Sequence, residues 1–141
     1  MAAIIKRRPL RFASVSAAWR TILGGTSPTG LYTPTATLTT NLDGATTFST
    51  AYTRIGDRVI VSGYVEADAT AAGGTLTELR LDKPVASDLT SVKAGGSAAL
   101  GGFATSVFIG PNAATDLIRL LWVSPTTGVV GISFIFQYEV V

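Results

Sequence analysis

The stretch that decides the fold is residues 58–67, which read RVIVSGYVEA. Its side chains alternate along the chain between one set, Val59, Val61, Gly63 and Val65, and a second set, Ile60, Ser62, Tyr64 and Glu66. A period of two residues places successive side chains on opposite faces of a β-strand. We therefore predict a β-strand in this stretch, with three valines on one face.

Short stretches of the same kind follow one another through the rest of the chain. We expect further strands at residues 33–40, 47–55, 75–81, 104–109, 115–123 and 131–141. We expect turns at Asp43-Gly44, Gly56-Asp57, Gly73-Gly74, Gly110-Pro111-Asn112 and Pro125 to Gly128, and no strand in the glycine-rich residues 85–102. Seven or eight short strands without a long helix predict an all-β fold, an antiparallel sandwich or jelly-roll-like module.

A basic arm precedes the predicted strands. Residues 1–25 carry no acidic residue and five basic ones, while the remainder has six basic and nine acidic residues; the basic residues of the arm are Lys6, Arg7, Arg8, Arg11 and Arg20. Gly24-Gly25 and Ser27-Pro28 have the composition of a linker. The chain is therefore divided into an arm with its linker, residues 1–30, and one β domain, residues 31–141.

The arm combines its charges with apolar side chains. Phe12, Val15, Trp19 and Ile22 fall at helical spacing, although alternation around Val15 also permits an extended arm. We expect Lys6, Arg7, Arg8, Arg11, Phe12, Trp19 and Ile22 to dock on an acidic surface of another protein. Binding of nucleic acid and a merely solvated terminus are the alternatives, and five charges make a weak footprint for nucleic acid.

The composition argues against catalysis. The chain has no cysteine and no histidine, so no thiolate nucleophile, imidazole base or zinc cage can be built. Glu66 and Asp68 project from one face of a strand end, where we expect solvated carboxylates rather than a calcium or acid/base site. The loop at residues 95–102 lacks the Lys-Ser/Thr of a phosphate loop. We expect that the protein is not an enzyme and that it binds no metal ion and no cofactor.

Two predicted strands have apolar side chains on both faces. Residues 117–123 read LIRLLWV, and the last strand adds Ile135 on its second face. Charged residues are 14% of the chain, against about 25% in an ordinary domain. Burial between copies of the chain would explain both observations. For the low charge the alternative is a soluble surface built from Thr, Ser, Gly and Ala, and for the two-faced strands it is an end loop folded over the sheet. We expect Tyr64, Trp122 and Ile135 near such an interface.

Signals for export or membrane insertion are not found in the sequence. The apolar pair Ile4-Ile5 precedes the basic cluster, which is the reverse of a secretory signal. The apolar residues 117–123 are interrupted by Arg119 and fall far short of the ~20 residues of a membrane helix. We expect no membrane partner.

The run YTRIGDRVIVSGYV, residues 52–65, resembles a segment of bacteriophage virion proteins, among them fibre tips and capsid decoration proteins. Further similarity lies in LYTPTATLTTNLDG (31–44), GTLTELRLDKPVAS (74–87), GGSAALGG (95–102) and SFIFQYEV (133–140). The resemblance covers about residues 31–141 and carries no catalytic motif. It implies a jelly-roll-like homotrimer in the virion, assembled in the host cytoplasm.

Three functions agree with this resemblance. The first is a capsid decoration (cement) or head-fibre protein, bound through its arm to the major capsid protein or another virion protein. The second is the receptor-binding tip of a tail fibre, with Tyr32, Tyr52, Tyr64 and Trp122 as candidates for contact with a host-surface glycan. The third is a shell protein with an RNA-binding arm, which the small charge of the arm disfavours.

Overall fold

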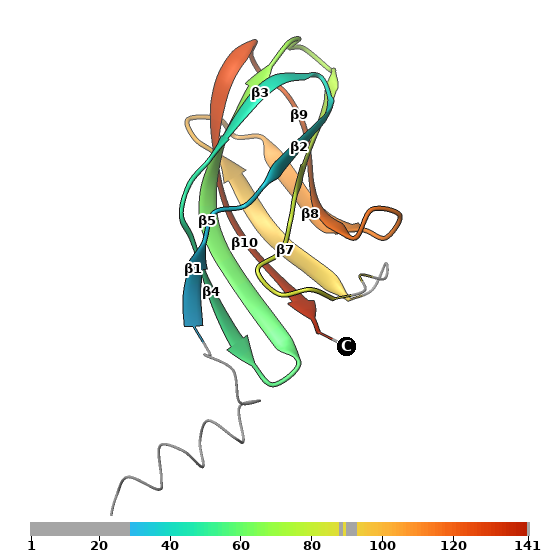
Figure 1. The fold of residues 1–141 in the computed structure, drawn as a ribbon. Coiled ribbons are helices and arrows are strands. Elements are labelled where there is room, and N and C mark those ends of the chain that lie inside the picture. The colour runs from blue at the N-terminus through green and yellow to red at the C-terminus, as the bar shows by residue number, and fades with distance from the viewer. Residues whose placement is uncertain (1–28, 88, 90–92, 141) are drawn as a thin grey trace, which may run out of the picture.

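The computed structural model describes residues 29–87, 89 and 93–140, and these residues form one antiparallel β-sheet with no helix (Figure 1). The ten strands are β1 (Thr29–Tyr32), β2 (Ala36–Thr40), β3 (Leu42–Thr47), β4 (Thr50–Ile55), β5 (Arg58–Ala69), β6 (Leu76–Leu81), β7 (Ala94–Leu100), β8 (Ser106–Asn112), β9 (Leu117–Val123) and β10 (Gly128–Glu139). Their order is β1-β4-β5-β10-β7-β8-β9-β6-β2, and β3 pairs with β5. The predicted all-β antiparallel fold is confirmed, and the curled sheet is consistent with a sandwich or jelly-roll-like module.

The two longest strands form the middle of the sheet. β5 and β10 are paired over their whole length, from Gly128 opposite Ala69 to Glu139 opposite Arg58. The alternation predicted for residues 58–67 is confirmed, since Val59, Val61 and Val65 are buried. On β10 the buried set comprises Val130, Ile132, Phe134, Phe136 and Tyr138. Burial of such apolar side chains, at roughly 1.5–3 kcal/mol each, is the main force that closes the sheet.

The curled sheet is closed by a corner at Asn41. β2 pairs with β6 and β3 pairs with β5, so the segment from Ala36 to Thr47 connects two strands that are distant in the sheet order (Figure 1). Asn41 joins the two strands with a φ of 59°, a conformation that asparagine tolerates better than most residues. The predicted turn at Asp43-Gly44 is wrong, because both residues lie inside β3, where a register shift between Leu42 and Gly44 absorbs the irregularity.

The glycine-rich stretch contains a strand that the sequence pattern missed. β7 lies between β10 and β8, with Phe134 opposite Ala98 and Ser97 opposite Phe108. At Gly96 the two backbones come so close that an added Cβ would lie 2.2 Å from the Ile135 carbonyl oxygen. Small residues are therefore what the pairing of β7 with β10 requires at this point.

The loop that follows β6 is fastened to the end of the sheet by a buried lysine. The Lys83 Nζ atom donates hydrogen bonds to Asp116 Oδ1 at 2.6 Å and to the Ser87 carbonyl oxygen at 2.5 Å, and its side chain is 4% exposed. Leu89 N donates to the same carboxylate at 2.8 Å.

Tyr138 holds the same loop through its hydroxyl group. Burial raises the pKa of Tyr138 to about 12, so its hydroxyl stays protonated and can both donate to and accept from the Val85 backbone.

The ion pair at Asp116 predicts a dependence of stability on pH. Burial acts to raise the pKa of Asp116, but hydrogen bonds from Lys83 and the Leu89 amide, with the charge of Lys83, hold the pKa below 3.8. A carboxyl group whose pKa is lower in the folded state than in the unfolded state stabilises the fold at a pH above its unfolded-state pKa. This contribution is lost as the pH falls through the folded-state pKa. Because Asp116 is 47% exposed, we expect a contribution of only about 1 kcal/mol.

The variant Asp116→Asn tests this dependence, since asparagine keeps the shape of the side chain and accepts the backbone φ of 55° at this position. We expect urea unfolding to show a smaller loss of stability for the variant than for the wild type between about pH 6 and about pH 2.5. Equal acid sensitivity in the two proteins would show that Asp116 does not contribute.

Candidate functional site

One row of side chains runs across the outer face of the sheet from β1 to β9. Strand registers place its members opposite one another in succession: Leu31, Ala51, Ser62, Ile135, Ser97, Phe108 and Leu121. We name this set the outer row. Three of its large apolar members are exposed, with Leu31 at 74%, Ile135 at 47% and Phe108 at 53%, and Leu121 at the end of the row is partly buried. Alternation explains the arrangement, because the neighbours of these residues along each strand point into the core.

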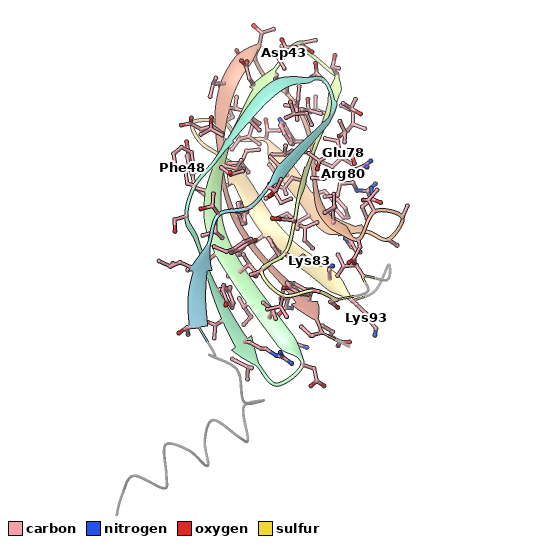
Figure 2. The ribbon with its side chains drawn as sticks, in the orientation of Figure 1. Asp43, Phe48, Glu78, Arg80, Lys83 and Lys93 are labelled. Atoms are coloured by element: carbon pink, nitrogen blue, oxygen red, sulfur yellow. The ribbon has the colours of Figure 1, made fainter. Side chains whose placement is uncertain are left out.

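The outer row lies in a part of the sheet with almost no charge. The three adjacent strands β10, β7 and β8 contain a single charged residue, Glu139, at the end of β10. Charges return on the strands beyond β8, where Arg80 and Glu78 form an ion pair at 2.7 Å (Figure 2). Arg119 lies beside the outer row, with its guanidinium 5.7 Å from the centre of the Phe108 ring. The face is therefore apolar and neutral at its middle and charged at its rim.

Shallow hollows flank the side chain of Ile135. One hollow of about 290 Å³ is lined by Ile60, Gly95, Gly96, Ser97, Ile135, Phe136 and Gln137. The other, of about 450 Å³, is lined by Ser97, Ala98, Ala99, Ser133, Phe134 and Ile135. The small residues of β7 create both hollows next to the protruding isoleucine. Protruding side chains and hollows on one neutral face allow that face to interdigitate with another apolar surface.

A second feature, which we name the acidic aromatic corner, consists of Phe48, Tyr64, Glu66 and Asp68. The rings of Phe48 and Tyr64 are 5.4 Å apart between centroids and are 40% and 38% exposed. Phe48 projects from the edge of the molecule (Figure 2). The Tyr64 ring lies against β10, since a Cβ added at Gly131 would be 2.1 Å from its hydroxyl oxygen. Partial desolvation, and then the neighbouring Glu66, raise the pKa of Tyr64.

The carboxylates of the corner border a hollow of about 230 Å³. Its lining comprises Gly44, Ala45, Thr46, Glu66, Asp68 and Val129. Glu66 accepts a 3.4 Å hydrogen bond from the Tyr64 hydroxyl. The two ion pairs among the described residues, Arg80–Glu78 and Lys83–Asp116, involve neither Glu66 nor Asp68. The described part of the chain holds no group of three or more ligating side chains that could bind a metal ion.

The three residues predicted to lie near an interface differ in their exposure to solvent. Ile135 and Tyr64 are exposed on the outer face, on neighbouring strands. Trp122 lies inside the core, where its side chain is 2% exposed, so it has no surface to offer to another chain. It is buried because the inner face of β9 carries Ile118, Leu120 and Trp122. The predicted arm residues, all before residue 29, lie outside the described residues.

Sequence reasoning did not single out two prominent members of the outer row. Phe108 alternates with the buried Val107 and Ile109, a signal that the strand pattern already contained. Leu31 lies on β1, a short strand at the start of the domain that the sequence did not predict as a separate element. Sequence alone indicated the strand that contains Phe108 but not which of its faces would stay exposed.

Comparison of the chain with protein-family models, with curated proteins and with solved structures finds no significant match. Within the described residues, no helix has the length and apolar character to cross a membrane.

Proposed function

We propose that this protein is a non-catalytic structural component of a bacteriophage particle, a capsid decoration (cement) or head-fibre protein. It assembles as a homotrimer through the outer row and attaches to the particle through its basic arm. The role in a virion and the number three come from the resemblance of residues 31–141 to phage virion modules. In a cement role, each trimer would join neighbouring capsid subunits mechanically.

The observation that carries the proposal is the uncharged outer face of β10, β7 and β8. Two exposed apolar side chains, Ile135 and Phe108, project from it, with hollows lined by small residues beside Ile135, and Leu31 extends the outer row on β1. Large apolar patches with a polar rim mark interaction sites, and most soluble oligomers are formed by copies of one chain. Burial of this face between copies also accounts for a charged content of 14%. Tyr64 lies outside the outer row and is not needed for this contact.

Replacing Ile135 with aspartate is expected to dissociate the trimer into monomers. The change places a carboxylate in the middle of an apolar contact, where its desolvation has no compensating partner. Sedimentation velocity at micromolar concentration measures the result. Ile55→Asp is the matched control, because Ile55 is 53% exposed on the outer side of β4, opposite Arg58 at the end of the strand pair and away from the outer row.

The control is expected to remain trimeric and both variants are expected to stay folded by circular dichroism. A wild-type monomer, or trimers of both variants, would refute assembly through the outer row. The location of the protein in a cryo-EM map of intact particles tests the virion role separately.

A further inference from the structure

The acidic aromatic corner has the chemistry of a site for an arginine side chain. A guanidinium group can stack on an aromatic face while its N–H groups bind a carboxylate. Tyr64 and Phe48 offer exposed rings, and Glu66 follows Tyr64 by two positions on the same face of β5. Asp68 extends the acidic surface along that face, next to the hollow at Thr46 and Val129. A neutral peptide would leave both carboxylates without a countercharge.

The same chain supplies a segment of the complementary charge. Residues 1–25 contain four arginines and one lysine and no acidic residue. By contrast, the rest of the chain carries three more acidic than basic residues, nine against six. Charge complementarity therefore favours the arm as the occupant of the corner.

The direction of β1 places the start of the described chain away from the corner of its own copy. Thr29, where the chain enters β1, lies opposite Thr53, which lies opposite Ile60 on β5. Two residues later, Leu31 lies opposite Ala51, which lies opposite Ser62 on β5. β1 therefore comes nearer to the corner in the direction from Thr29 to Leu31. The chain therefore enters the sheet at the end away from Glu66, about 20 Å from it along β5.

We propose that the acidic aromatic corner binds an arginine of the basic arm, within residues 1–25, of a second copy of this protein. This inference rests on the docking role of the arm in the proposed function and gives the arm a partner: an adjacent copy. Arg7, Arg8 and Arg11 are the candidate guanidinium groups, with Lys6 beside them. The contact would link neighbouring copies electrostatically, in addition to the apolar contact of the outer row.

Zero-length carbodiimide cross-linking of the full-length protein tests the proposal. An equal mixture of ¹⁴N- and ¹⁵N-labelled protein separates links between copies from links within a copy by mass spectrometry. We expect the Lys6 amine to form mixed-isotope links to Glu66 or Asp68. At 1 M salt, where the screening length is about 3 Å, the yield should fall about tenfold. Asp57, exposed at the opposite end of β5, is the reference carboxylate.

Two variants separate a binding role from a structural one. Tyr64→Ala removes the stacking surface and is expected to lower the yield of mixed-isotope links about tenfold, whereas Tyr64→Phe keeps the ring and should keep the links. Links confined to one copy, equal linking of Lys6 to Asp57, or an unchanged yield in Tyr64→Ala would each overturn the proposal. Sedimentation reports trimer formation independently of the cross-links. It therefore distinguishes a failure of the proposed assembly through the outer row from a failure of the proposed binding at the corner.

Discussion

The variant Gly96→Ala is expected to lose about 3 kcal/mol of stability or more, one of the two largest losses that we predict for a single substitution in this protein. The added Cβ would lie 2.2 Å from the Ile135 carbonyl oxygen and 2.7 Å from Phe136 Cα. Both contacts are with backbone atoms of β10, so no side-chain rotation can relieve them. β7 must therefore move away from β10 and weaken the hydrogen bonds between the two strands.

Gly95→Ala is the matched control for this prediction. It lies next to Gly96 on the same strand, a Cβ there meets nothing within 4 Å, and its φ is not in the left-handed region. Thermal unfolding should show the Gly95 variant within a few degrees of the wild type and the Gly96 variant about 10 °C lower. Equal melting temperatures for the two variants would show that the close approach of the strands is absent in solution.

The second large effect is expected at the corner that closes the sheet. The Asn41 side chain donates from Nδ2 to the Ala71 carbonyl oxygen at 2.8 Å and to Thr77 Oγ1 at 2.7 Å. Its Oδ1 accepts from Ala71 N at 2.7 Å and from Thr70 Oγ1 at 2.5 Å. Asn41 thus fixes the turn after β5 and the start of β6 to the corner between β2 and β3.

Asn41→Ala is expected to lower the free energy of unfolding by about 3 kcal/mol. Alanine in the left-handed conformation costs about 1–2 kcal/mol. The loss of the amide also deprives the Ala71 N–H and the fully buried Thr77 hydroxyl of a partner, at about 1 kcal/mol or more each. Urea unfolding measures the change.

Asn41→Gly divides this loss into its two causes, because glycine accepts a φ of 59° without strain but makes no side-chain hydrogen bond. We expect its stability to lie between those of the wild type and the alanine variant. An alanine variant as stable as the wild type would mean that the corner does not depend on Asn41.

The strands that the sequence predicted best are those where alternation and residue type agree. Residues 58–67 place valines on one face, and the last strand places Phe134, Phe136 and Tyr138 on one face, so both were predicted correctly. β7 was missed because AGGSAAL contains no β-branched or aromatic residue. Its strand state depends on the close approach of β10, a tertiary contact that local propensity does not encode.

The functional surface was predicted less completely, for a reason visible in β9. Its two sets of side chains are both mostly apolar, so alternation alone did not show which set faces the core. The structure buries Ile118, Leu120 and Trp122 and leaves Val123 exposed. Ile135, in contrast, alternates with aromatic residues of the core, and its outward position follows from its strand alone.

The position of β10 in the sheet determines when the protein can fold during synthesis. Of the ten described strands, β10 is translated last, yet it lies between β5 and β7 and pairs with both. Until residues 128–139 have left the ribosome, β5 and β7 have no common neighbour, and the valine-rich face of β5 has no β10 aromatics to pack against. Contacts between residues so distant in sequence form slowly. The nascent chain therefore presents unpaired strand edges until β10 has emerged, and chaperones that cover such edges would act on it before then.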